Sequence, residues 1–513
     1  MLEKNITKNV DVLVNAYLEN HWEEVLADLQ TLVAIPSYRE NEKANAAEGA
    51  PFGPGPKAAL DAILNIAQRM GFETYNMNGY IGYADFLGEA PVENSGDAPA
   101  DTPAEETGCA QGSGQNLTQG GKRQIGIIGH VDVVPAGPGW SVDPYTVTHK
   151  EGYLLGRGVI DDKGPVIVAL HAMNMWKQQG VTLPYDLRFL FGAAEETGME
   201  DVAYYQARTP DPDFLFTPDA EFPVCYGEKG HLDLTLTSKP LTQGLIFDIQ
   251  GGSAPNAVPG SAFAVLDFTE LLAGKGTDAS LQEFPEFPQA DHITVSCLSG
   301  RRVRIDALGK CQHASTPEGG INAIGILIDY LLEANLCSQE EREFFQLLQP
   351  LLSTSDGSAF DCACSDTDFG ALTMIGGMIS MEGGCIRQTI DCRYPTTISA
   401  SEIEERIAAA AHTCGATTQR DSCMEPFLID SDSPEVQTLL RAYNEATGED
   451  AKPFTMGGGT YARLFKNAAS FGPEKPWVPV PSWVGGMHGP DEGVSEEALK
   501  EAFRIYARVL VEF

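Results

Sequence analysis

The strongest constraint on the fold is an apolar strand that ends abruptly on two polar side chains. Residues 125–130 form a run of strand length that ends on His130, with Asp132 two residues on and a proline- and glycine-rich turn at 135–139. Burying such a pair without partners costs several kcal/mol. Alternate strand residues face the same side, so the Asp132 carboxylate can orient the His130 imidazole as a metal ligand. An ordinary hydrogen-bonded pair is the alternative interpretation.

Two more apolar strands end in the same way. Residues 187–194 lead into Glu195 and Glu196, and residues 213–217 lead into Asp219. A helix expected at 165–179 lies between the first and second strands of this series and follows two further aspartates. This order of elements is typical of an α/β fold, in which ligands bind at the carboxyl ends of strands. We therefore expect a mixed, mostly parallel sheet with helices on both faces.

The length of 513 residues exceeds what one hydrophobic core usually supports. From about residue 227 the pattern changes to alternating strands and two helices, which predicts an inserted α+β domain at 227–395. The α/β domain then consists of residues 1–226 and 396–513. Within it, residues 89–124 are acidic, polar and poor in large apolar side chains, and we expect a low-complexity loop without chemistry there.

The composition excludes several classes of partner. The chain has 34 basic and 72 acidic residues and a formal net charge of −38, which argues against nucleic acids and anionic membranes. No apolar run reaches the length of a transmembrane helix, and the first residues do not resemble a secretory leader. The 11 cysteines are scattered without paired spacing, so we expect a cytoplasmic protein.

Five residues of metal-ligand type fall where the pattern places the ends of elements: His130, Asp161, Glu196, Asp219 and His488. Two imidazoles with carboxylates suit zinc, with manganese or cobalt as alternatives. Five ligands exceed the needs of one tetrahedral zinc, whereas two ions bridged by one aspartate and a water would use all of them. The chain has no His-Glu-x-x-His pair, no Gly-x-Ser-x-Gly elbow and no phosphate-binding loop.

These motifs occur in the order of a known family. They are His130-Val-Asp132, the Asp-x-Lys-Gly of 161–164, Glu195-Glu196-x-Gly, Pro-Asp-Ala-Glu at 218–221 and Met-His-Gly-Pro at 487–490. Over nearly the whole chain the sequence resembles the di-zinc aminoacylase and carboxypeptidase metallopeptidase family. Stretches at 251–256, 312–318 and 457–461 make it most similar to the peptidase V-like dipeptidase branch.

The resemblance implies a role for each residue. One ion would be held by His130, Asp161 and Asp219, and the other by Asp161, Glu196 and His488. Glu195 would be the general base that takes a proton from the bridging water, with Asp132 behind His130. In the inserted lid domain, His313 would stabilise the oxyanion, and the substrate would be bound by Asn256, Arg393, Gly458, Gly459 and Thr460.

Some of these residues, and two others, also have a purely structural interpretation. His313 fits a surface loop, Arg393 a surface ion pair and the glycines a tight turn, while Lys163 fits a structural ion pair and His171 the core. The expected function is hydrolysis of dipeptides with a free amino terminus, whose ammonium group would be bound by Asp162 or Glu221. The alternatives are an N-acyl-amino-acid deacylase with the same centre and a non-catalytic metal-binding relative. The size of the lid favours a monomer.

Overall fold

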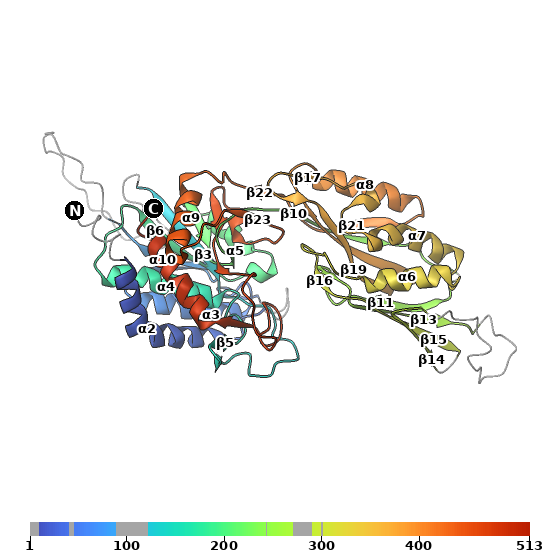
Figure 1. The fold of residues 1–513 in the computed structure, drawn as a ribbon, viewed down its shortest axis with the longest axis horizontal. Helices are drawn as coiled ribbons and strands as arrows, with labels where there is room; N and C mark the ends of the chain where they lie inside the picture. Colours follow the sequence, from blue (N-terminus) through green and yellow to red (C-terminus); the bar gives the residue numbers. More distant parts are fainter. Residues whose placement is uncertain (1–9, 40–45, 89–121, 243, 270–289, 299–300) are drawn as a thin grey trace. The chain divides into compact units, whose positions relative to one another are not determined.

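The computed structural model describes residues 10–39, 46–88, 122–242, 244–269, 290–298 and 301–513 (Figure 1). The chain divides into two compact units. The first consists of Met1–Tyr226, Ile429–Phe454 and Thr460–Phe513, and the second of Gly227–Leu428 and Thr455–Gly459. Among the helices of the described ranges, none combines the length and the apolar character needed to cross a membrane.

The first unit is built on a mixed sheet. Its strands follow the order β1 (Glu73–Met77), β2 (Ile81–Phe86), β6 (Asp186–Gly192), β3 (Gln124–His130), β7 (Phe214–Thr217), β24 (Ala468–Ser470) and β9 (Cys225–Glu228). β3 runs parallel to β6 and β7, and β24 runs parallel to β7, whereas β1 and β2 form an antiparallel edge. Every residue of β3 and β6 is buried, as expected for strands covered on both faces. The predicted fold class is confirmed.

Within the described part of the first unit, six α-helices surround this sheet (Figure 1). They are α2 (Val10–Val33), α3 (Pro54–Arg69), α4 (Lys163–Gln178), α5 (Glu200–Gln206), α9 (Pro434–Thr447) and α10 (Glu496–Val509). α4 is buried over its first fourteen residues because it packs against both α2 and α10. α2 is one continuous helix of 24 residues.

The first unit also contains short strands and 3-10 turns outside the central sheet. They are β4 (Thr148–Lys150), β5 (Tyr153–Leu155) and β26 (Gly493–Ser495) in one small sheet, β8 (Ala220–Glu221) paired with β25 (Pro473–Glu474), and the 3-10 turns η1 (Glu195–Thr197) and η4 (Tyr461–Leu464).

The second unit is an antiparallel sheet with helices on one face (Figure 1). The strand order is β14 (Ile293–Leu298), β15 (Arg302–Leu308), β13 (Ser261–Asp267), β11 (Ile246–Gly251), β19 (Thr373–Glu382), β20 (Cys385–Tyr394), β10 (Gly230–Thr237) and β21 (Thr417–Met424). The helices are α6 (Ala323–Glu333), α7 (Gln339–Ser353) and α8 (Ala400–His412). Alternating burial along β15 fits a sheet with one packed face.

Minor elements complete the second unit: β12 (Ala257–Val258) with β16 (Gln312–His313), β17 (Ser365–Asp366) with β18 (Gly370–Ala371), η3 (Ser358–Phe360), and β22 (Phe427–Leu428). β23 (Phe454–Met456) lies where the chain enters the segment Thr455–Gly459.

The second unit is longer than the insertion expected from the sequence. The expected boundary at residue 395 is wrong, because α8 packs on this sheet and β21 pairs with β10 along its length. β21 is an edge strand whose residues are mostly polar and partly exposed, so it lacks the alternation of apolar and polar residues that marks strands such as β15. Most of the loop expected at 89–124 lies outside the described residues, and β3 begins at Gln124.

Candidate metal centre

The five residues of metal-ligand type come together in the first unit. His130 is the last residue of β3, Asp161 precedes α4, and Glu196 lies in η1 after β6. Asp219 follows β7, and His488 lies in the loop before β26. Each side chain thus follows a strand or precedes a helix or strand, as expected for a site in an α/β fold.

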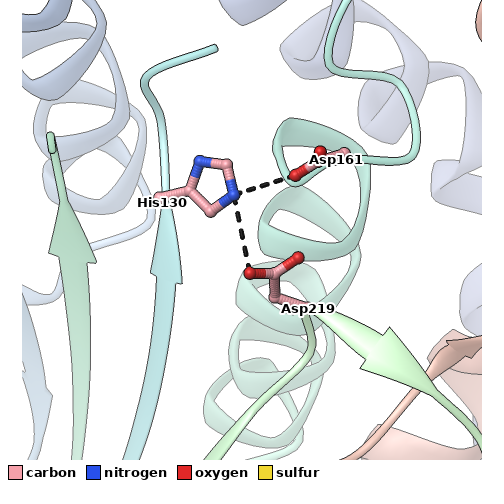
Figure 2. Close-up of side chains that lie close together, drawn as sticks. All are labelled: His130, Asp161 and Asp219. Carbon is pink, nitrogen blue, oxygen red and sulfur yellow. Dashed lines mark hydrogen bonds and ion pairs between the residues drawn. The ribbon is translucent and has the colours of Figure 1, made fainter. Parts of the chain in front are cut away.

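A first group joins His130 to two carboxylates (Figure 2). The Nε2 atom of His130 lies 3.0 Å from Oδ1 of Asp161 and 3.6 Å from Oδ2 of Asp219. His130 is fully buried and Asp161 is nearly so, which leaves their polar atoms facing one another. An imidazole nitrogen and two carboxylate oxygens in such a group are suited to one divalent ion.

A second group shares Asp161 with the first. The Nε2 atom of His488 lies 2.9 Å from Oδ2 of Asp161 and 3.2 Å from Oε2 of Glu196. Asp161 therefore presents one oxygen to each group. This is the arrangement that a carboxylate bridging two ions would need.

Asp132 has a wider role in the geometry than the sequence suggested. Nδ1 of His130 lies 3.0 Å from the backbone oxygen of Asp132 and 3.6 Å from its carboxylate. That carboxylate accepts the backbone N–H groups of Glu195 and Glu196, each at 3.2 Å. One aspartate thus touches the imidazole and holds the turn that carries both glutamates.

Asp162, the residue after Asp161, does not face the two ligand groups. Asp162 is fully buried, and its carboxylate accepts the backbone N–H of His130 at 3.1 Å. A side chain at Gly129 would come within 2.5 Å of Oδ2 of Asp162, so the strand needs glycine beside this carboxylate. Asp161, and not Asp162, faces both groups.

Lys163 is structural, but the ion pair expected for it is wrong. Its ammonium group donates to the backbone oxygens of Leu32 and Ile35, both at 2.9 Å, and so binds the carboxyl end of α2. His171 is also structural, because its ring lies between the Tyr17 hydroxyl and the Asp28 carboxylate.

Several residues near the centre were missed by sequence reasoning. Asp201 accepts the N–H groups of Ala193 and Ala194 and the hydroxyl of Tyr461, so it fixes the chain just before Glu195. Glu492 accepts backbone N–H groups on the approach to Asp161 and pairs with Arg157. The sequence signal for Tyr461 and Glu492 was their position in or beside the motifs at 457–461 and 487–490. Their hydrogen-bond partners lie far away in the chain, so the sequence did not show what these residues contact.

Burial and mutual charge shift the pKa of most groups in the centre. Burial raises the pKa of Asp219 to about 7, and burial together with the charge of Asp219 raises that of Glu195 well above its usual range. Hydrogen bonds to Asp161 and Glu196 raise the pKa of His488 to about 11. Burial alone would raise the pKa of Asp161, but hydrogen bonds from His130 and His488 outweigh it and lower that pKa. So many buried carboxylates need positive charge nearby.

The donors fit divalent ions. Both groups combine imidazole nitrogen with carboxylate oxygen, which suits zinc and its neighbours in the first transition row. Oε1 of Glu196 is buried and has no hydrogen-bond partner among the described residues. An ion beside Glu196 would account for an oxygen that is otherwise costly to bury.

The substrate-binding residues predicted in the second unit also lie together. His313 pairs with Ala257 across β12 and β16, and the backbone oxygen of Asn256 accepts the N–H of Ala314 at 2.9 Å. A side chain at Gly457 would come within 2.7 Å of Cβ of Ser315. The turn at His313 therefore lies against the glycine-rich segment that contains Gly458 and Gly459.

Arg393 reaches the same segment from β20. Its Nη1 donates to the backbone oxygen of Gly457 at 3.1 Å, while Nε and Nη2 bind Asp391 at 2.8 and 2.7 Å. Asp391 in turn lies 3.2 Å from Nε2 of His231, which lies 2.9 Å from Asp233. The distances among His231, Asp233 and Asp391 would allow them to hold an ion. Because the carboxylate of Asp391 already binds the guanidinium group of Arg393, we interpret these residues as an ion-pair network.

Thr460 belongs to the first unit, although the residue before it, Gly459, belongs to the second. It is buried, its hydroxyl lies 3.0 Å from that of Ser470, and it accepts the N–H of Ala462. The structure thus gives Thr460 a capping role at η4.

Comparison with known proteins identifies the family of the chain. Residues 126–512 match peptidase family M20/M25/M40. A Bacillus subtilis (strain 168) protein named "Putative dipeptidase YtjP" is 28% identical over 498 residues, covering 96% of this chain and 97% of that protein. Human carnosine dipeptidase 1 shares the fold with a TM-score of 0.53 at 16% identity, and the dipeptidase Dug1p from Saccharomyces cerevisiae with a TM-score of 0.54 at 14%; each comparison covers 98% of both chains.

The family match spans most of the chain, so this protein belongs to peptidase family M20/M25/M40. It is therefore a hydrolase of a metallopeptidase family, as the sequence resemblance predicted.

Proposed function

We propose that the protein is a metal-dependent dipeptidase that cleaves dipeptides with a free amino terminus. The observation that carries the proposal is the pair of ligand groups that share Asp161, with Glu195 adjacent to the ligand Glu196. Similarity over the full length to a protein named as a dipeptidase supports the choice of substrate class.

The ligand roles follow from the two groups. His130, Asp161 and Asp219 would hold one ion, and Asp161, Glu196 and His488 the other, with zinc favoured over manganese and cobalt. Bound ions of this kind polarise a carbonyl group and lower the pKa of a water molecule. Asp132 and Asp162 keep the His130 ring and the end of β3 in place.

Glu195 is proposed as the general base. It is not a member of either ligand group, and its raised pKa, caused by burial and by the charge of Asp219, suits a carboxylate that must hold a proton. It would take the proton of the attacking water and pass it to the leaving amine. Asp132 orients Glu195 through the backbone N–H that it accepts.

The second unit is proposed as the lid that binds the substrate. Arg393 is held by Asp391 with its guanidinium fork fixed, which suits bidentate binding of a terminal carboxylate. His313 is proposed to stabilise the oxyanion, with Asn256 and the backbone of Gly458 and Gly459 as further contacts.

Glu221 is the better candidate for binding the substrate ammonium group. Asp162, the other candidate from the sequence, is fully buried and already accepts the N–H of His130. Glu221 is partly exposed and lies on β8, two residues beyond Asp219, where Glu474 of β25 is its neighbour across the parallel pair. Two adjacent carboxylates favour a positively charged group.

Both sets of residues belong to one chain, so we propose an active monomer; a mass near 55.2 kDa on gel filtration is expected. The scattered cysteines favour a reducing compartment such as the cytoplasm.

The test of substrate class is hydrolysis of a dipeptide beside its N-acetylated form, with protein stripped of metal and reloaded with zinc or manganese. The proposal predicts cleavage of the free dipeptide at a rate well above that of the blocked one. It also predicts that Glu221→Gln raises KM for the free dipeptide more than for the blocked form. Preferred cleavage of the N-acetyl compound would instead support an N-acyl-amino-acid deacylase, and metal binding without either reaction would support a non-catalytic relative.

A further inference from the structure

One buried carboxylate links the two loops that carry Asp161 and His488. Glu492 is fully buried, and its Oε1 accepts the backbone N–H of Gly158 at 2.9 Å, of Ile160 at 3.2 Å and of Asp161 at 3.4 Å. Its backbone oxygen accepts the N–H of Gly156 at 3.0 Å. Glu492 stands four residues after His488, so its side chain ties the His488 loop to the turn that ends at Asp161.

Arg157 completes this link. Its Nη1 binds Oε2 of Glu492, and its Nη2 donates to the backbone oxygen of Gly489 at 3.3 Å. The loop from Gly485 to Gly493 is closed at its base, where the N–H of Gly493 donates to the oxygen of Gly485 at 3.1 Å. Arg157 and Glu492 therefore attach a closed loop to the approach to α4.

The two imidazoles differ in how they are held. His130 is fully buried at the end of a central strand and is contacted by Asp132 and Asp162. The side chain of His488 is 51% exposed, so packing does little to fix it, and its position depends on how the loop is anchored. Glu492 and Arg157 anchor that loop to the turn before Asp161, while Asp491 accepts the N–H of Ser141 at 2.7 Å and Gly493 pairs with Leu155 of β5.

We propose that Glu492 is a positioning residue that sets the 2.9 Å separation between His488 and Asp161 and thereby the affinity of the second ligand group for its ion. Glu492 contacts the first group only through the N–H of Asp161, at 3.4 Å, whereas it contacts the second group through Asp161 and through the loop that carries His488. This inference rests on the proposed metal-dependent function, but its test measures ion binding and needs no substrate.

The substitution Glu492→Gln is the direct probe. Glutamine has nearly the same shape, but its amide must present N–H groups either to Arg157 or to the backbone N–H groups of the Asp161 turn. The amide NH2 group of glutamine would then face another hydrogen-bond donor, so we expect the loop that carries His488 to move. Loss of such an outer contact to a metal ligand typically weakens ion binding 10- to 100-fold.

The experiment isolates each group by removing the imidazole of the other. Zinc affinity is measured by chelator competition in His130→Ala, which leaves the His488 group, and in His488→Ala, which leaves the His130 group, each with and without Glu492→Gln. We expect a 10- to 100-fold loss from Glu492→Gln in the His130→Ala background and less than about 3-fold in the His488→Ala background. Equal losses in both backgrounds, or no loss in either, would overturn the proposal.

The matched control is Asp85→Asn. Asp85 forms a buried two-point ion pair with Arg188, at 2.8 Å for both contacts, between β2 and β6 of the same unit. It should destabilise the first unit in a comparable way while leaving zinc affinity unchanged in both backgrounds.

If Glu492→Gln does not fold, Arg157→Lys probes the same link, because lysine keeps the charge but cannot bind Glu492 and Gly489 together. A smaller loss confined to the His488 group supports the proposal, and equal affinity changes in both groups contradict it. Failure of the wild-type protein to bind any ion would instead refute the proposed function.

Discussion

At the scale of single residues, several buried carboxylates of the first unit hold other residues in place. Asp132 is the clearest case, because it contacts His130 and accepts the N–H groups of both Glu195 and Glu196. Each N–H binds a different oxygen of Asp132, and asparagine would present its NH2 group to one of them, so we expect Asp132→Asn to reduce dipeptide turnover 10- to 100-fold. Steady-state kinetics on metal-loaded protein measure this. Turnover within a factor of two of wild type would show that Asp132 is dispensable.

The candidate ligands differ in how far the sequence alone could place them. His130, Asp161, Glu196 and Asp219 follow a simple rule, since each lies at or beside the end of a strand or the start of a helix, whereas His488 lies in a loop and was marked by its Met-His-Gly-Pro motif; the structure brings all five together. Glu492 follows no such rule. Its partners are backbone N–H groups more than 300 positions away, and a backbone contact leaves no trace in the identity of the partner residue.

At the scale of elements, a buried aspartate joins three helices of the first unit. Asp28 of α2 is 3% exposed and binds Arg69 of α3 and His171 of α4. Burial would raise its pKa, but these hydrogen bonds and charges outweigh burial and lower the pKa below the usual 3.8. A lowered pKa in the folded state means that the charged form stabilises the protein above pH 3.8 and that this contribution is lost as the pH falls further.

Asp28→Asn should therefore lower the free energy of unfolding by about 2 kcal/mol near neutral pH. The difference between wild type and variant should shrink as the pH falls below the usual aspartate pKa. Denaturant unfolding across that range measures it, with Asp61→Asn, at a partly exposed ion pair with Lys57 of α3, as the control for a surface charge. A difference that stays constant with pH would contradict the assigned cause.

Elements with a strong apolar pattern were predictable, and those without one were not. β3, β6 and β7 are buried throughout and appear in the sequence as largely apolar runs of strand length. β21 lies at the edge of the second sheet and exposes most of its polar residues, so the sequence pattern placed the end of the insertion too early. The ion pair predicted for Lys163 was wrong because its partners are backbone oxygens at the end of α2, which leave no trace in the identity of the side chains there.

At the scale of the whole molecule, the proposed ion ligands and all five tryptophans belong to the first unit. Tryptophan fluorescence thus reports on the unit that holds the candidate metal centre. We expect ions at about 100 times their Kd to stabilise this unit by about 2.7 kcal/mol and to raise its unfolding midpoint. Hydrogen exchange of β19 and β20 in the second unit should change little when the ions are removed with a chelator. An unchanged tryptophan transition would contradict the placement of the ions.

We propose that two divalent ions, held by five residues of the first unit, support hydrolysis by a base that binds neither ion. The most direct test measures ion content and dipeptide hydrolysis together, for wild type and Glu195→Gln, after stripping and after adding zinc. We predict two ions bound by both proteins and a loss of turnover of roughly 100-fold or more in the variant alone. Wild-type protein that binds no ion, or a Glu195→Gln variant that hydrolyses dipeptides as fast as wild type, would contradict the account.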